Sequence, residues 1–163
     1  MKTYHKTSGK TDWETPQYFF DQINNLFGPF DIDVCASKDN AKCPIYFSID
    51  DDALTIPWQG NRCFCNPPYG SQLSKWVRKA YAESLSGACV VMVLPARTDT
   101  SWFHRYCSKS QCFFIKGRLS FSNSSGRSPF PTMVCVFGTF NRFGNRLASF
   151  LTPSDWLPAN FSV

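Results

Sequence analysis

Residues 62–94 read RCFCNPPYGSQLSKWVRKAYAESLSGACVVMVL, and this stretch decides the expected fold. A short apolar run at 62–65 predicts a strand, which the two following prolines end because proline cannot continue a ladder of backbone hydrogen bonds. Apolar residues at helical spacing over 73–85 predict a helix. The continuous apolar run at 88–94 is typical of a strand that is covered on both faces. Strand, helix and strand in this order predict a parallel α/β unit.

Upstream of this unit, Thr15 is placed to cap a helix that starts with Pro16 and ends at Gly28. Apolar residues at helical spacing predict one buried face: Phe19, Phe20, Ile23, Leu26 and Phe27. Alternating apolar and acidic residues over 30–34 then predict a half-buried strand with Asp33 near its carboxyl end.

Downstream, Asp99 or Thr100 is expected to cap a short helix. Further strands are predicted at residues 112–115, 119–121 and 133–140, the last two pairing as a hairpin. Their connection, 122–131, is rich in Ser, Gly and Pro and is expected to be exposed and mobile.

The two ends of the chain differ from its middle. The polar residues 1–11 are expected to form a flexible arm, and residues 12–163 a single domain. Residues 142–163 predict a short helix and an apolar ending that docks on the domain or on a second copy in a homodimer.

The composition is that of a soluble globular protein, with 43% hydrophobic and 18% charged residues. The sequence predicts neither a signal nor a membrane span, so we expect a cytoplasmic protein. Eight cysteines without a C-x-x-C pair, and only two histidines, favour reduced core thiols over disulfides or a metal site. The absence of G-x-S-x-G and H-E-x-x-H motifs does not favour a hydrolase.

The charge is unevenly distributed along the chain. Residues 1–60 carry 5 Lys and 9 acids, whereas residues 61–163 carry 12 Lys plus Arg and 3 acids. The basic second part suits a polyanion such as nucleic acid, and the acidic first part suits a cation or sugar hydroxyls. The alternative is that both serve solubility.

The turn Asn66-Pro67-Pro68-Tyr69 has a specific chemical interpretation. A conjugated exocyclic amine such as adenine N6 is a poor nucleophile because its lone pair is delocalised into the ring. Two acceptors, the Asn66 side-chain carbonyl and the Pro67 backbone carbonyl, would grip its N–H bonds and favour a directed lone pair. Tyr69 offers a ring on which a planar base stacks. The alternative is an ordinary turn with Asn66 capping it and Tyr69 in the core.

Other short motifs stand in order around this turn, over about residues 12–138. They are Trp13-Glu14-Thr15-Pro16, Asp33-Val34-Cys35-Ala36, Asn40-Ala41, Asp51-Asp52-Ala53-Leu54, Leu94-Pro95-Ala96-Arg97-Thr98-Asp99-Thr100 with Trp102-Phe103-His104, and Gly117-Arg118-Leu119-Ser120-Phe121. Together the set resembles the compact phage-type, Dam-like DNA N6-adenine methyltransferases. The resemblance implies a Rossmann-like α/β fold dependent on S-adenosylmethionine, with a mostly parallel sheet and an antiparallel C-terminal hairpin.

The resemblance also implies cofactor-binding residues: Trp13, Thr15, Pro16, Asp33, Ala36, Asn40, Asp52, Leu54 and Asn66. Asp33 and Ala36 would form the turn after the first strand, and Asp52 would accept from the cofactor's adenine amino group. Three of these have rival interpretations: Thr15 as a helix cap, Asp33 as a strand-end carboxylate and Leu54 as core. The chain departs from the wider methyltransferase pattern because no glycine-rich loop follows the first strand.

A duplex hides adenine N6, so the resemblance implies that the target adenine in double-stranded DNA is flipped out of the helix. Candidate DNA contacts are Lys75, Lys79, Arg97, Arg105, Arg118, Phe121 and Arg127. No large target-recognition domain is expected, so specificity falls to residues 96–109 and 117–131, a dimer partner or DNA shape. GATC is the site that the family suggests. Methylation of RNA or of a protein glutamine, and a noncatalytic DNA-binding relative, remain alternatives.

Overall fold

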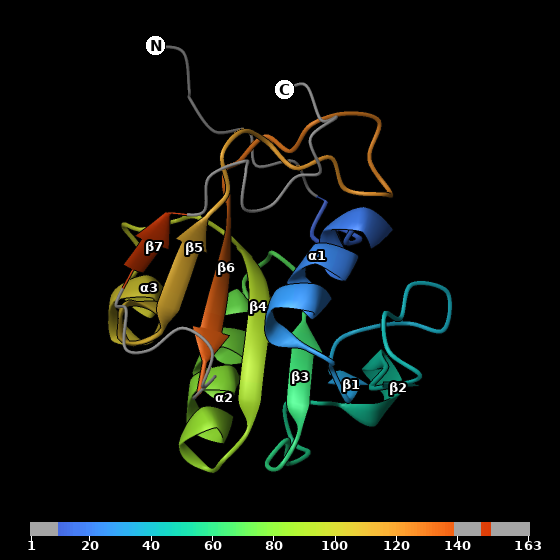
Figure 1. The fold of residues 1–163 in the computed structure, drawn as a ribbon, viewed down its shortest axis with the longest axis vertical. Coiled ribbons are helices and arrows are strands. Elements are labelled where there is room, and N and C mark those ends of the chain that lie inside the picture. The colour runs from blue at the N-terminus through green and yellow to red at the C-terminus, as the bar shows by residue number, and fades with distance from the viewer. Residues whose placement is uncertain (1–9, 139–147, 151–163) are drawn as a thin grey trace.

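The structure is a computed structural model, and it describes residues 10–138 and 148–150 (Figure 1). Its helices are α1 (Gln17–Phe27), α2 (Leu73–Leu85) and α3 (Ser101–Arg105), with 3-10 turns η1 (Ile49–Asp51) and η2 (Cys107–Lys109). Its strands are β1 (Ile32–Asp33), β2 (Ile45–Tyr46), β3 (Arg62–Cys65), β4 (Cys89–Pro95), β5 (Gln111–Phe114), β6 (Thr132–Phe137) and β7 (Ala148–Phe150).

These strands form one sheet in the order β2-β1-β3-β4-β6-β5-β7. The neighbours from β2 to β4 are parallel, as are β5 and β7, whereas β6 runs antiparallel to both β4 and β5. The predicted class is therefore confirmed: a mostly parallel α/β sheet with an antiparallel C-terminal part. The strand-helix-strand unit predicted from residues 62–94 is β3, α2 and β4.

The order of the strands reverses at β1. The chain runs from β1 outward to β2 and then returns to the other side of β1 as β3. Asp33 ends β1 and Asn66 directly follows β3, so both lie at the carboxyl edge of the sheet. In open α/β sheets, ligands bind beyond the carboxyl ends of the strands at such a reversal.

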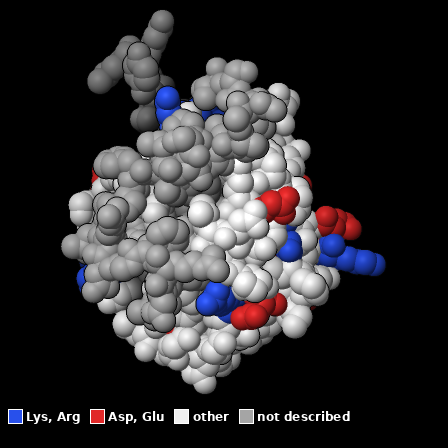
Figure 2. Space-filling view, viewed as in Figure 1, with Lys and Arg blue, Asp and Glu red and all other residues white. Residues whose placement is uncertain are grey.

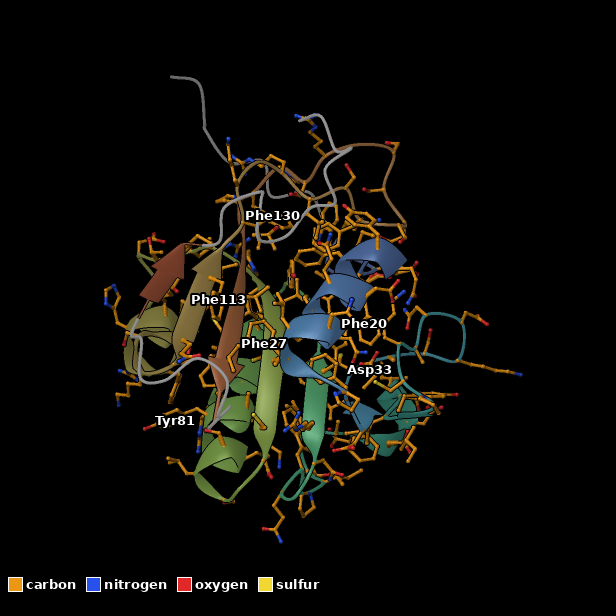
Figure 3. All side chains as sticks on the ribbon, in the orientation of Figure 1. Phe20, Phe27, Asp33, Tyr81, Phe113 and Phe130 are labelled. Carbon is orange, nitrogen blue, oxygen red and sulfur yellow. The ribbon has the colours of Figure 1, made fainter. Side chains whose placement is uncertain are left out.

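Helices cover both faces of the sheet, with α1 on one face and α2 and α3 on the other (Figure 1). The face predicted for α1 is confirmed, since Phe19, Phe20, Ile23 and Phe27 are buried. The ring of Phe20 packs edge-on against Phe64 of β3, with 5.0 Å between ring centroids, and that of Phe27 lies 5.3 Å from Phe113 of β5 (Figure 3). Helix α1 thus packs against both the parallel and the antiparallel part of the sheet.

Two local predictions near the helices are decided by the structure. The prediction that Thr15 caps α1 is wrong: Pro16 occupies the N-cap position, without a side-chain hydrogen bond, and the helix starts at Gln17. The Thr15 hydroxyl instead accepts from the side-chain amide of Asn66. The cap predicted for α3 is confirmed at Thr100, whose hydroxyl accepts from the Phe103 N–H.

The predicted strand at 119–121 is wrong, because the hairpin is formed by β5 and β6. Residues 115–131, called the β5–β6 loop from here on, contain no strand. Most residues of the connection 122–131 are exposed, as predicted, and Ser128 is the exception that is buried. Figure 1 shows the loop, in orange, passing above the amino end of α1. Leu119 and Phe121, which precede the connection, are buried and pack against the domain.

The arm at residues 1–9 and most of the predicted tail helix and ending at 142–163 lie outside the described residues; within the tail, 148–150 form strand β7. All eight cysteines are free thiols, and six are buried. None of the helices described at 10–138 combines the length and the apolar character needed to cross a bilayer.

Candidate active site

A cavity of about 280 Å³ opens at the carboxyl ends of β1 and β3. Its walls come from segments that are far apart in the sequence: residues 12–15, 33–42, 47–53 and 64–68, with Trp76 of α2. Its size lies near the lower end of the range of about 300–1,000 Å³ for small-molecule sites. The fold thus places a pocket at the strand reversal.

The Asn66 side chain is oriented by hydrogen bonds to residues just before α1. Its amide nitrogen donates to the Trp13 carbonyl and to the Thr15 hydroxyl, the latter at 2.9 Å. A backbone carbonyl only accepts, so the NH₂ group, and not the oxygen, must face Trp13. The amide oxygen is then buried and receives no hydrogen bond from any described residue. Buried polar atoms are nearly always hydrogen-bonded in proteins, so this oxygen is free to accept from a group outside the described residues.

The turn that carries Asn66 is held at its other end through Tyr69. The Tyr69 N–H donates to the Thr11 carbonyl at 2.7 Å, and its hydroxyl donates to the Val93 carbonyl in β4 at 3.0 Å. Burial raises the pKa of this hydroxyl well above its usual value, so the group stays protonated as a donor. Pro67 and Pro68 between these anchors line the cavity.

An aromatic cluster of Trp13, Tyr69, Phe121 and Phe130 covers the turn. Tyr69 meets Phe130 at a centroid distance of 5.4 Å and Phe121 at 6.2 Å, both nearly edge-on. Trp13 contacts the same two phenylalanines at 5.2 and 5.3 Å. Tyr69 is only 6% exposed, so its ring packs in the core as the rival interpretation held. The β5–β6 loop, which carries Phe130 (Figure 3), closes over the Asn66 turn.

Asp33 is a buried carboxylate in the cavity wall, 2% exposed (Figure 3). One carboxylate oxygen accepts from the Cys35 N–H at 3.2 Å and the other from the Lys42 N–H at 3.1 Å. The side chain therefore fastens the turn after β1. Burial raises the pKa of Asp33 to about 6, and these two backbone donors partly oppose the shift.

This shift predicts a pH dependence of stability. From about pH 4 to pH 6, wild type should lose stability relative to Asp33→Asn, because the unfolded carboxyl ionises before the buried one does. The raised pKa corresponds to about 3 kcal/mol of unfolding free energy, which is present below about pH 4 and lost above pH 6. Urea unfolding of both proteins across this range checks the result. A stability difference that does not change with pH would show that Asp33 has an ordinary pKa.

The three consecutive aspartates have separate structural roles. Asp51 accepts from the Ser48 N–H and hydroxyl in a capping box, at 2.7 and 2.8 Å. Asp52 adopts a left-handed conformation with φ of 48° and lines the cavity. Asp50 is exposed and lies outside the cavity lining. The preference for Asp52 over its two neighbours therefore agrees with its position.

The structure brings most of the expected cofactor residues to the cavity: Trp13, Thr15, Asp33, Ala36, Asn40, Asp52 and Asn66. Pro16 and Leu54 do not line it, whereas Ala53, the neighbour of Leu54, does. Sequence reasoning missed several lining residues: Cys35, Phe47, Ser48, Ile49, Phe64 and Trp76. Ile49 could have been found from the sequence, because an isoleucine between Ser48 and Asp50 does not fit the periodicity of a buried helix or strand. In the structure its side chain is 93% exposed and borders the cavity.

The expected DNA contacts separate into two groups. Lys75, Arg97, Arg105, Arg118 and Arg127 are exposed. Lys79 instead pairs with Glu83 at 2.6 Å and lies over the Trp58 ring, and Phe121 is buried in the aromatic cluster. Figure 2 shows basic and acidic side chains interspersed on the visible described surface, so no single basic patch dominates this face. Within residues 10–138, no three His, Cys, Asp or Glu side chains gather as a metal site.

The mostly parallel sheet, the cavity at its strand reversal, and Asn66, Pro67 and Pro68 in the cavity wall are the features that the resemblance to methyltransferases predicts. Comparison with known proteins specifies the class further. A family model described as "DNA N-6-adenine-methyltransferase (Dam)" matches residues 2–139, and the chain belongs to this family.

Two relatives agree with this assignment. The DNA N-6-adenine-methyltransferase of Haemophilus phage HP1 is 28% identical over 159 residues, which cover 93% of this chain and 92% of the relative. The protein of the same name from Escherichia phage T1 is 32% identical over 92 residues, covering 56% of this chain and 38% of the relative. The resemblance that the sequence motifs indicated is confirmed.

Proposed function

We propose that the protein transfers a methyl group from S-adenosylmethionine to N6 of a flipped adenine in double-stranded DNA. The observation that carries the proposal is the Asn66 amide oxygen, a buried acceptor that no described residue satisfies. Asn66 is one of the residues that line the cavity at the sheet's strand reversal. The names of the phage relatives support DNA as the substrate and adenine N6 as the acceptor.

The cavity lining fits S-adenosylmethionine, which when bound supplies an electrophilic methyl group on a positively charged sulfur. Carboxylates at Asp33 and Asp52 suit a cation and hydrogen-bond donors, and the apolar side chains of Phe47, Ile49 and Ala53 suit a flat ring. Asn40 holds the turn beside them, since its amide oxygen accepts from the Ser37 N–H at 2.7 Å. We assign cofactor binding to these residues together with Trp13, Ala36 and the backbone of Thr15, whose hydroxyl is bonded to the Asn66 amide.

Asn66 and Pro67 would act on the adenine amine. The Asn66 amide oxygen accepts one N–H and the Pro67 carbonyl the other, which draws the lone pair out of the ring. The nitrogen then forms a bond to the methyl carbon as the carbon–sulfur bond breaks, leaving S-adenosylhomocysteine. The amine would lose one N–H proton to solvent water during or after the transfer, which leaves neutral N6-methyladenine. Positioning and preorganised acceptors, with no covalent enzyme intermediate, provide the acceleration.

Base entry requires a change in the aromatic cluster. Tyr69 is the stacking surface that we assign to the flipped adenine, yet Phe121 and Phe130 now contact its ring. Phe121 is 1% exposed, whereas Phe130 is only partly buried. We assign Phe130 as the ring that the incoming base displaces.

The DNA would lie against the carboxyl edge of the sheet. Arg97 follows β4 there, and the Ala96 N–H donates to Pro131 at the end of the β5–β6 loop, which also carries Arg118 and Arg127. Exposed arginines at this edge suit phosphate contacts, which would make binding salt-dependent. We assign site specificity to residues 96–109 and 117–131 and propose GATC as the first sequence to test.

The cofactor assignment predicts that Asp52→Gly weakens S-adenosylmethionine binding about 10- to 100-fold, as expected for the loss of one hydrogen bond to a charged group. Glycine tolerates the positive φ of this position, so the change removes the carboxylate without backbone strain. Asp50→Ala is the matched control, because Asp50 is also exposed but lies outside the cavity lining. Calorimetric titration measures the affinity of both variants for S-adenosylmethionine. Equal affinities of Asp52→Gly and Asp50→Ala would exclude Asp52 from the site.

The function itself is tested with methyl-labelled S-adenosylmethionine offered with unmethylated duplex DNA, RNA or protein extract. Label in N6-methyladenine of DNA supports the proposal, whereas label in RNA or in protein glutamine supports the alternative acceptors. Failure of the protein to bind S-adenosylmethionine in calorimetry would indicate a noncatalytic relative. Sequencing of methylated DNA after expression in a methylation-free host then tests GATC.

A further inference from the structure

The amide of Asn66 is useful as an acceptor in only one of its two flipped orientations. With the oxygen toward the cavity it accepts an amine N–H, whereas a 180° flip would present its own NH₂ to that N–H. The orientation is enforced by the Trp13 carbonyl and the Thr15 hydroxyl, which receive the NH₂ group. Thr15 is 3% exposed, so water has little access to replace its hydroxyl.

The segment that provides these two acceptors is itself held by Asn123 of the β5–β6 loop. The Asn123 side chain accepts from the Glu14 N–H at 3.0 Å and donates to the Asp12 carbonyl at 3.2 Å. Next to it, the Ser122 N–H donates to the Glu14 carbonyl at 2.9 Å. The Asn123 side chain thus bonds the residues on either side of Trp13. The carbonyl of Trp13 in turn accepts from the Asn66 side-chain amide.

These contacts form a continuous chain from the loop to the acceptor. Asn123 fixes residues 12–14, and Trp13 and Thr15 fix Asn66. The same loop carries Phe121 and Phe130 of the aromatic cluster. The loop that the proposed function places against the DNA is therefore bonded to Asp12 and Glu14, the chain neighbours of Trp13 and Thr15, which hold the Asn66 amide.

We propose that Thr15 and Asn123 are positioning residues for methyl transfer: Thr15 holds the Asn66 amide with its oxygen toward the acceptor amine, and Asn123 holds the segment that does so. The proposal rests on the proposed function, because it concerns the same amide. It predicts an effect on the chemical step and not on cofactor affinity. The Thr15 hydroxyl thus acts through Asn66 and does not contact S-adenosylmethionine directly.

The first test compares Thr15→Val with Thr15→Ser. Valine keeps the shape and removes the hydroxyl, so we expect kcat to fall about tenfold, as for one lost hydrogen bond, with the Kd for S-adenosylmethionine changed less than about twofold. Serine restores the hydroxyl and most of kcat. A wild-type kcat in the valine variant, or an equal loss of cofactor affinity, would overturn the assignment. Cofactor titration also verifies that each variant is folded.

The second test compares Asn123→Ala with Asn61→Ala. Asn61 lies before β3 and outside the cavity lining, and its side chain bonds the Trp58 and Gln59 carbonyls. We expect a lower kcat at saturating DNA for Asn123→Ala and an unchanged one for Asn61→Ala. Equal kcat values for the two variants would contradict a role for Asn123. The wild-type protein is assayed alongside: no DNA methylation by it refutes the proposed function, whereas active wild type with unaffected variants refutes only this inference.

Discussion

Asn66→Ala is expected to lower the rate of DNA methylation by about 10²- to 10³-fold while leaving the affinity for S-adenosylmethionine nearly unchanged. The size follows from the loss of one preorganised group that acts mainly in the transition state. The alanine side chain supplies no acceptor, and the buried oxygen that now has no partner disappears. Stability should fall by about 1–3 kcal/mol, because the Trp13 carbonyl and the buried Thr15 hydroxyl lose the amide that donates to them. Single-turnover label transfer at saturating cofactor measures the chemical step directly.

Asn61→Ala provides the matched control for this experiment. Asn61 precedes β3, whereas Asn66 follows it. The side chain of Asn61 bonds the Trp58 and Gln59 carbonyls, which lie before β3 in the chain. The same substitution is thus made at the opposite end of one strand, away from the cavity lining. Near-normal turnover by Asn66→Ala would remove Asn66 from the catalytic step, even if the protein still methylates DNA.

Tyr69→Ala is expected to have the second large effect, on both stability and DNA methylation. Removing a fully buried aromatic side chain costs about 3–5 kcal/mol of unfolding free energy, because a cavity remains among Trp13, Phe121 and Phe130. Loss of the stacking surface should also lower kcat/KM for DNA about 10- to 100-fold, as expected for about 1–3 kcal/mol per base. Urea unfolding measures the first effect, and methylation at low temperature the second.

Tyr69→Phe distinguishes the two roles of this side chain. Phenylalanine keeps the ring and loses only the hydroxyl bond to the Val93 carbonyl, so we expect a loss of about 1 kcal/mol in stability with nearly normal kcat/KM. If Tyr69→Phe lost as much activity as Tyr69→Ala, the hydroxyl and not the ring would carry the function. If both variants kept full kcat/KM, Tyr69 would be a core residue only.

Predictions from local pattern succeeded where a segment's structure depends on its own residues. The apolar run at 88–94 has to be buried wherever it lies, and it became the central strand β4. The two prolines after Asn66 end β3 in any context, because they cannot donate to a sheet. The Thr100 cap is likewise a contact between neighbours in sequence.

The failures concern residues whose partners are distant in the chain. Thr15 was expected to cap the adjacent helix, but its hydroxyl bonds Asn66, 51 positions away. Residues 122–131 were expected to be exposed, and most of them are, but their composition did not indicate that the Asn123 side chain bonds residues about 110 positions earlier. Side-chain periodicity contains no information on such pairs, because they arise only when β3 and the β5–β6 loop meet at the same edge of the sheet.

For this protein, the sequence alone determined the class of sheet, the position of the sharp turn and the chemical groups available at it, because strand breaking and donor or acceptor character are properties of the residues themselves. Only the tertiary structure decided which way the Asn66 amide faces, which of the three aspartates borders the cavity, and that an aromatic cluster covers Tyr69. Each of these depends on the distance between groups that the chain separates and the fold brings together.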